Sequence, residues 1–203
     1  MRRALILAGL IVLTSTAPAA AAPLGRTVLE GGDPGRRAIY QAIIDSGRAP
    51  QAAVKVKLIE RPCPDVEGEP PCVAYNGRWL WYMDPGWAEP QNLAGRFTEL
   101  SVLHELGHVY DFGGPPDRHR TRFLKALGMA GWLDPLNETW EKFAMGYAYC
   151  AAGMSWAEFR RQLPADGAFA SKLSTEQGGY WAYGFDYGKR DYQAVCRAIG
   201  RRR

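Results

Sequence analysis

The segment His104-Glu-Leu-Gly-His108 has the residue types and the spacing of a zinc site. Positions i and i+4 of a helix lie one turn apart on one face, so two imidazoles at this spacing can bind one zinc ion from the same side. Glu105 lies between them, where it can accept a proton from a water at the metal's open position. The alternative interpretation is a pair of hydrogen-bonded core histidines with an ion-paired glutamate.

A catalytic zinc ion needs a third protein ligand, and three side chains are candidates. His119 is the only other histidine, and we expect it in a polar, Arg-rich loop. Asp111 follows His104 by about 10 Å along a helix axis, which suits a hydrogen-bond acceptor for an imidazole better than a ligand. Glu141 is the strongest candidate, because Ala144 and Ala148 share its helical face and let a second helix approach closely. A surface role for Glu141, in a cap or an ion pair, is the alternative.

The elements that must position these residues follow an α+β order, with strands first and helices later. A Gly- and Pro-rich entry segment, 23–35, precedes a helix at 37–46. A strand over 52–60 has alternating apolar residues, and Asn76-Gly77 predicts a hairpin over 73–82. We therefore expect a small antiparallel sheet. Helices are predicted over 93–110, 121–127, 137–152, 156–163 and 191–199, with a loop over 178–188.

Two predicted helices carry a family resemblance, which covers about residues 97–150. His-Glu-x-x-His on one helix, followed by Glu-x-x-Ala-x-x-(aromatic)-Ala on another, resembles the gluzincin branch of the zincin metallopeptidases, especially its minimal members. The resemblance implies a zincin-like domain that binds Zn²⁺ through His104, His108 and Glu141. It also implies that Glu105 is the general base.

The same resemblance implies three further features. A strand at the edge of the sheet would align extended peptide, and residues 78–83 could match it. Larger gluzincins have an Asp four residues after the ligand Glu, where this chain has Met145, so we expect another group, Asp111, to orient the imidazoles. A downstream Tyr, His or Arg would stabilise the oxyanion, and the sequence does not choose among several candidates: Tyr147, Tyr180, Tyr183, Tyr187 and His119.

The first 21 residues have the layout of a secretory signal peptide. Arg2 and Arg3 precede an apolar stretch at 4–12 and a run of small residues at 19–22, with cleavage expected after Ala20 or Ala21. The remainder, residues 22–203, is about 180 residues long and fits one domain. We expect a secreted or periplasmic protein with no stable membrane insertion, because no second long apolar segment occurs.

The composition of the chain limits the classes of partner that we expect. The net charge of +4 arises partly from the two ends of the chain, and no basic surface with interleaved aromatic residues suggests nucleic-acid binding. Four cysteines remain after cleavage, an even number that predicts two disulfides in an exported chain. Of the three possible connectivities we favour Cys63–Cys72 and Cys150–Cys196. The alternative is a cysteine-containing metal site.

The sequence thus predicts a secreted zinc metallohydrolase, with a peptide or protein as the substrate. Zinc would polarise the scissile carbonyl and acidify its bound water, and Glu105 would pass that water's proton to the leaving amine. Two other functions use the same residues. One is a non-catalytic binding protein in which zinc only joins two helices, and the other is a zinc hydrolase of a non-peptide bond such as a cell-wall amide. Substrate preference, latency and oligomeric state do not follow from the sequence.

Overall fold

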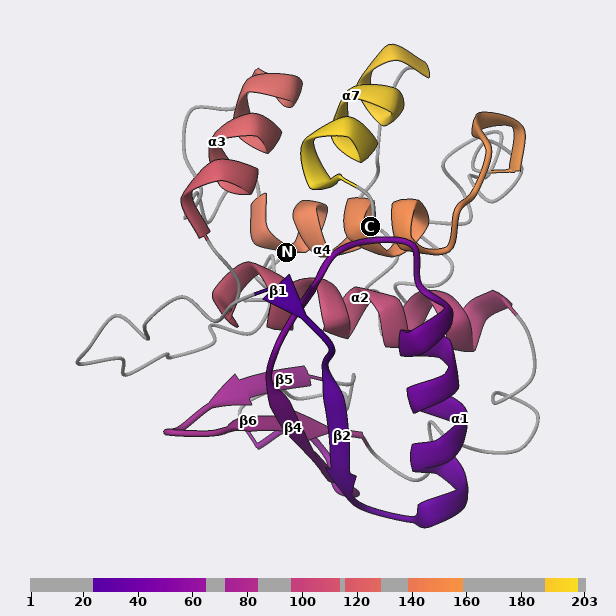
Figure 1. Ribbon diagram of the computed structural model, residues 1–203, viewed down its shortest axis with the longest axis vertical. Helices are drawn as coiled ribbons and strands as arrows, with labels where there is room; N and C mark the ends of the chain where they lie inside the picture. The colour runs from indigo at the N-terminus through magenta and orange to yellow at the C-terminus, as the bar shows by residue number, and fades with distance from the viewer. Residues whose placement is uncertain are drawn as a thin grey trace, which may run out of the picture.

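A small mixed sheet and two packed helices form the centre of the molecule (Figure 1). The computed structural model describes residues 24–64, 72–83, 96–113, 116–128, 139–158 and 189–200. The expected signal peptide and the expected loop at 178–188 lie outside these residues. The prediction of an α+β fold is confirmed.

The four-stranded sheet is mostly parallel, so the prediction of an antiparallel sheet was wrong. Its order is β2-β4-β6-β5, in which β2, β4 and β6 run parallel and only β5 runs antiparallel to its neighbour. The strands are β2 (Val28–Gly31), β4 (Lys55–Ile59), β5 (Cys72–Tyr75) and β6 (Trp79–Tyr82). A second ladder pairs β1 (Leu24–Gly25) with β3 (Gln51–Ala52).

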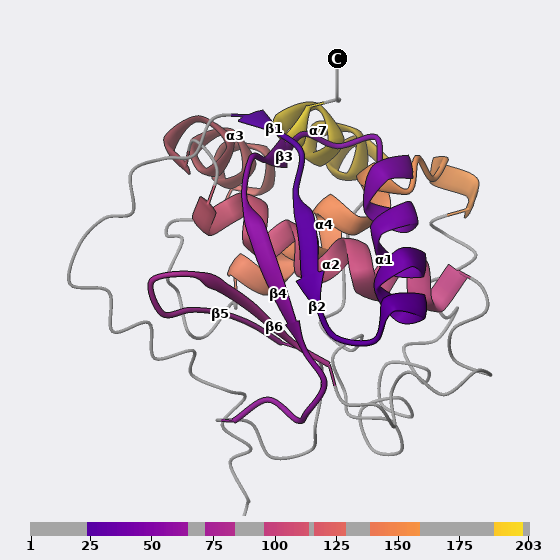
Figure 2. The ribbon, with the colours of Figure 1, turned by 60° about the horizontal axis from the view of Figure 1, so that its bottom comes forward.

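The parallel arrangement follows from a strand that the sequence analysis assigned to the entry segment. β2 is followed by α1 (Pro34–Ser46), which lies beside the sheet and returns the chain so that β4 enters parallel to β2 (Figure 2). Asp33 caps this helix by accepting a hydrogen bond from the Arg36 backbone N–H at 2.8 Å. Pro34 occupies the first turn, so the helix begins three residues before the predicted residue 37.

The alternation in β4 and the hairpin between β5 and β6 are both confirmed. Val56 and Leu58 are buried whereas Lys55 and Lys57 are exposed, as expected of a half-buried strand. Gly77 has a φ of 84°, which provides the left-handed conformation of the turn.

The hairpin strand at 78–83 is not an edge strand, which corrects the role expected from the resemblance. β6 lies between β4 and β5, and all four of its residues are buried. Among the described strands, β5 is the outer neighbour of β6 and runs antiparallel to it.

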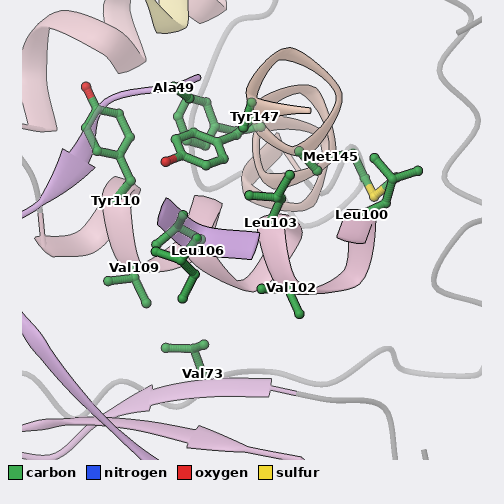
Figure 3. Close-up of a cluster of buried hydrophobic side chains, with 14 of the residues drawn as sticks. Ala49, Val73, Leu100, Val102, Leu103, Leu106, Val109, Tyr110, Met145 and Tyr147 are labelled. Atoms are coloured by element: carbon green, nitrogen blue, oxygen red, sulfur yellow. The ribbon is translucent and has the colours of Figure 1, made fainter. Parts of the chain in front are cut away.

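Helix α2 (Arg96–Gly113) lies between the sheet and α4 (Thr139–Ala151). Figure 3 shows Val102 and Val109 pointing from α2 toward Val73 on the sheet, whereas Leu103 and Tyr110 lie on the side of α4. A helix covered on both sides is apolar around most of its circumference. This burial explains why the apolar residues of α2 have mixed helical spacings.

Two further helices, α3 (Pro116–Leu127) and α7 (Lys189–Ile199), pack against each other beyond α4 (Figure 1). Both predicted disulfides are confirmed: Cys63–Cys72 follows β4, and Cys150–Cys196 joins α4 to α7. Of the helix predicted at 156–163, residues 156–158 are helical and the rest lies outside the described residues. No helix in the described part of the chain is long and apolar enough to span a membrane.

Candidate metal centre

The two histidines of the motif face each other on one side of α2. Their Nε2 atoms lie 3.2 Å apart, and their ring planes meet at 86°. Both side chains are buried, as is that of Glu105 between them. Tetrahedral zinc with Zn–N bonds of 2.0–2.1 Å separates two ligand nitrogens by about 3.3 Å. The two imidazoles therefore fit two corners of a zinc coordination sphere.

The same distance also fits a hydrogen bond between the two rings. Two nitrogen lone pairs repel each other at 3.2 Å unless a proton or a cation lies between them. A neutral histidine has one N–H and one lone pair, so one ring can donate to the other. The geometry thus fits both a metal site and a histidine–histidine hydrogen bond.

The Nδ1 atom of His104 contacts the sulfur of Met145 on α4, at 3.0 Å. The group that orients the imidazoles was expected to come from elsewhere, and this contact was not predicted. The sequence feature that could have indicated this contact is the position of Met145, where the larger gluzincins have an acidic residue. Whether Asp111 orients His104 or His108 stays a prediction.

The close approach of α4 to α2 that Ala144 and Ala148 predicted is present. A Cβ atom on Gly107 would lie 2.9 Å from the Ala144 Cα and 3.2 Å from the Tyr147 Cβ, too close for any larger residue without movement of the helices. Ala144 and Ala148 are fully buried. Gly107, inside the motif, therefore sets how near the backbone of α4 comes to the two histidines.

The predicted third ligand, Glu141, belongs to α4, one helical turn before Met145. Its side chain lies outside the described part of the structure, so its role as a ligand stays a prediction. Among the side chains that are described, no three His, Cys, Asp or Glu residues are arranged as a metal site.

Asp111 and His119, the other two candidate ligands, contact each other. The Asp111 carboxylate accepts hydrogen bonds from His119 Nε2 at 2.9 Å and from Arg120 Nε at 2.8 Å. A second bond from Arg120 Nη2 reaches its other oxygen at 3.1 Å. Asp111 and His119 are buried, and Arg120 is partly exposed. These contacts join the end of α2 to α3.

The prediction of His119 in an exposed loop was wrong. Helices were predicted over 93–110 and 121–127, with a loop between them, but Pro116 begins α3, because proline is favoured in the first turn of a helix. His119 therefore lies in α3 and packs against the ring of Tyr110 at 4.9 Å. Burial raises the pKa of the Tyr110 hydroxyl, which stays protonated at neutral pH.

One of the candidate oxyanion stabilisers has a partner in the core. The Tyr147 hydroxyl donates to the Pro50 carbonyl at 2.7 Å, and its ring is buried. Tyr180, Tyr183 and Tyr187 lie outside the described residues. The identity of the stabiliser stays open.

Comparisons with protein-family models, with curated proteins and with solved structures found no match for this chain.

Proposed function

We propose that this protein is an exported zinc metallopeptidase with its metal between α2 and α4. The observation that carries the proposal is the 3.2 Å separation of His104 Nε2 and His108 Nε2, which equals the spacing of two zinc ligands within a few tenths of an ångström. A glutamate between them is what a hydrolytic site needs and a structural site does not. The two disulfides are compatible with an exported protein.

The close packing of α4 supports Glu141 as the third ligand. The backbone of α4 nearly touches Gly107, and Met145 reaches His104 one turn after position 141. Position 141 lies on the same face of α4 as Met145, one turn earlier. His104, His108 and Glu141 would then hold zinc and leave one position open for water.

The chemistry divides between the metal and the protein side chains. Bound zinc supplies a Lewis acid that polarises a carbonyl and acidifies water. Glu105 accepts a proton at its carboxylate as the water attacks and returns it to the leaving amine. Gly107, which has no Cβ, allows α4 to approach α2 this closely.

The first test is the metal content of the purified protein and of Glu141→Ala. We expect one zinc per wild-type chain and greatly weakened binding in the variant. Glu138→Ala is the matched control, because it removes a carboxylate from the segment just before α4 and should leave zinc unchanged. Full zinc content in Glu141→Ala would move the third ligand elsewhere. No zinc in the wild type after reloading would leave only a histidine–histidine hydrogen bond.

A second test separates a peptidase from the other functions. The zinc-loaded protein is incubated with a quenched-fluorescence peptide library, with Glu105→Gln as the control. Cleavage by the wild type and not by the variant supports a peptidase. Zinc binding without peptide cleavage, followed by release of products from purified cell wall, would indicate a non-peptide amide as the substrate. Zinc binding with neither activity would indicate a structural metal.

A further inference from the structure

The contact between Met145 and His104 fixes which ring nitrogen of His104 has the proton. A thioether sulfur has no hydrogen and can only accept, so His104 Nδ1 must donate across the 3.0 Å contact. Both side chains are buried, 3% and 5% exposed, so water competes little for either group. In neutral His104 the Nε2 atom then has the lone pair, and this is the atom that faces His108.

We propose that Met145 is a positioning residue that holds His104 in its metal-binding tautomer through a sulfur acceptor. The part of this proposal that concerns zinc binding rests on the proposed function. The part that concerns the tautomer of His104 does not depend on zinc. The sulfur does the orienting that a carboxylate commonly does for a metal-bound histidine. Being neutral and a weak acceptor, it orients the ring without adding charge beside the site.

The same contact gives the two histidines different tautomers. Because His104 Nε2 is an acceptor, the proton in the 3.2 Å contact without metal belongs to His108 Nε2. His108 must give up that proton before a cation can bind between the rings, whereas His104 already presents a lone pair. The chain of contacts from Met145 through His104 thus sets the tautomers of both rings.

The first experiment reads the tautomers of the chelator-treated protein by ¹⁵N long-range NMR at about pH 8, where histidines of ordinary pKa are neutral. We expect His104 with its proton on Nδ1 and His108 with its proton on Nε2. Met145→Leu keeps the volume and removes the acceptor, so His104 should become a mixture of tautomers. Met145→Gln restores an acceptor of similar length and should restore the Nδ1–H form.

Met154→Leu is the matched control, because it makes the same substitution at another buried methionine, just beyond α4. It should leave both histidine spectra unchanged. A wild-type His104 with its proton on Nε2, or a Met145→Leu spectrum identical to that of the wild type, would overturn the proposal. Thermal unfolding of each variant identifies any that fails to fold.

The second experiment measures zinc affinity by competition with a chelator. Loss of an orienting acceptor should weaken zinc binding about 10-fold in Met145→Leu, with recovery to within a few-fold of wild type in Met145→Gln. Equal weakening of zinc binding in Met145→Leu and Met145→Gln would indicate an effect of packing rather than of hydrogen bonding. It would overturn the claim that the sulfur acceptor supports zinc binding. If the wild type binds no zinc, the proposed function fails, but the tautomer result still decides whether Met145 orients His104.

Discussion

Two buried histidine sites lie along α2, and they differ in what surrounds the imidazoles. In the middle of the helix, His104 and His108 face each other through their Nε2 atoms, with a neutral sulfur behind one ring. At the end of the helix, His119 of α3 faces the carboxylate of Asp111, which also binds Arg120.

Under the proposed function, the difference separates a metal site from a contact that joins two helices. A carboxylate that accepts from both an imidazole and a guanidinium has its charge compensated within the protein. Two imidazoles whose nitrogens converge need a proton or a cation between them. A ring can supply the proton, whereas a cation must bind from solution. We therefore expect substitutions in the middle of α2 to change metal binding and turnover, and substitutions at its end to change stability.

The largest expected effect is on turnover, from Glu105→Gln. An amide cannot take up the proton of an attacking water, so kcat/KM for a cleaved peptide should fall by about 10²- to 10⁴-fold. Zinc content should stay at the wild-type level, because Glu105 is not one of the proposed ligands. Glu99→Gln, in the first turn of the same helix, is the matched control and should retain turnover. Unchanged turnover in Glu105→Gln would remove the base from the mechanism.

Asp111→Asn should have the largest effect on stability. Removing one partner from a buried ion pair costs about 3 to 5 kcal/mol, and partial exposure of Arg120 favours the lower end of that range. Urea unfolding measures the loss, and zinc affinity should stay within a few-fold of wild type.

Asp45→Asn is the control for this prediction, because its ion pair with Arg26 is at the surface and should contribute little. If Asp111→Asn instead keeps its stability and loses zinc, Asp111 belongs to the metal site, and the contrast between the two regions of α2 disappears.

Gly107→Ala tests whether the helix separation matters to the metal. The new Cβ would lie 2.9 Å from the Ala144 Cα, which is backbone and cannot rotate away. Overpacking of this kind costs about 1 to 3 kcal/mol. Because α4 must shift, zinc affinity should fall together with stability, as measured by chelator competition and urea unfolding.

Gly146→Ala is a matched substitution for that test, on the other helix. Its Cβ would lie 2.8 Å from a Val195 methyl group, so it strains the contact of α4 with α7. Stability should fall while zinc affinity stays near the wild-type value. Equal losses of zinc affinity in both variants would mean that general loosening, rather than the separation of α2 and α4, weakens the site.

The elements predicted correctly are those with a strong local pattern. The alternation in β4 reflects the two-residue period of a strand, and the spacing in α4 reflects the period of a helix. The Asn76-Gly77 turn reflects the positive φ that Gly77 adopts easily. The disulfide prediction also held, because one bridge closes a short loop and the other ties the last helix to α4.

The features missed by the sequence analysis depend on tertiary contacts. β2 is four residues long and ends in Gly31, with Gly32 next to it, so only its pairing with β4 identifies it as a strand. Without β2, the parallel order of the sheet does not follow. His119 is buried by Asp111 and Tyr110, which lie before the break between two helices. Met145 was overlooked because a thioether is a weak acceptor, and only proximity shows that it is used.

Tyr147→Phe has the smallest expected effect. It tests whether α4 contributes only to packing and the metal site or also to the chemistry. The hydroxyl donates to Pro50 at 2.7 Å, so its loss should cost about 1 kcal/mol of stability, with kcat/KM unchanged. Tyr192→Phe removes a similar bond to the Met154 carbonyl, at 2.8 Å, and should cost about the same. If Tyr147→Phe lowers kcat/KM 10-fold or more while Tyr192→Phe does not, the Tyr147 hydroxyl leaves Pro50 during the reaction. Tyr147 would then be the oxyanion stabiliser, and α4 would contribute to the chemistry as well as to the metal site.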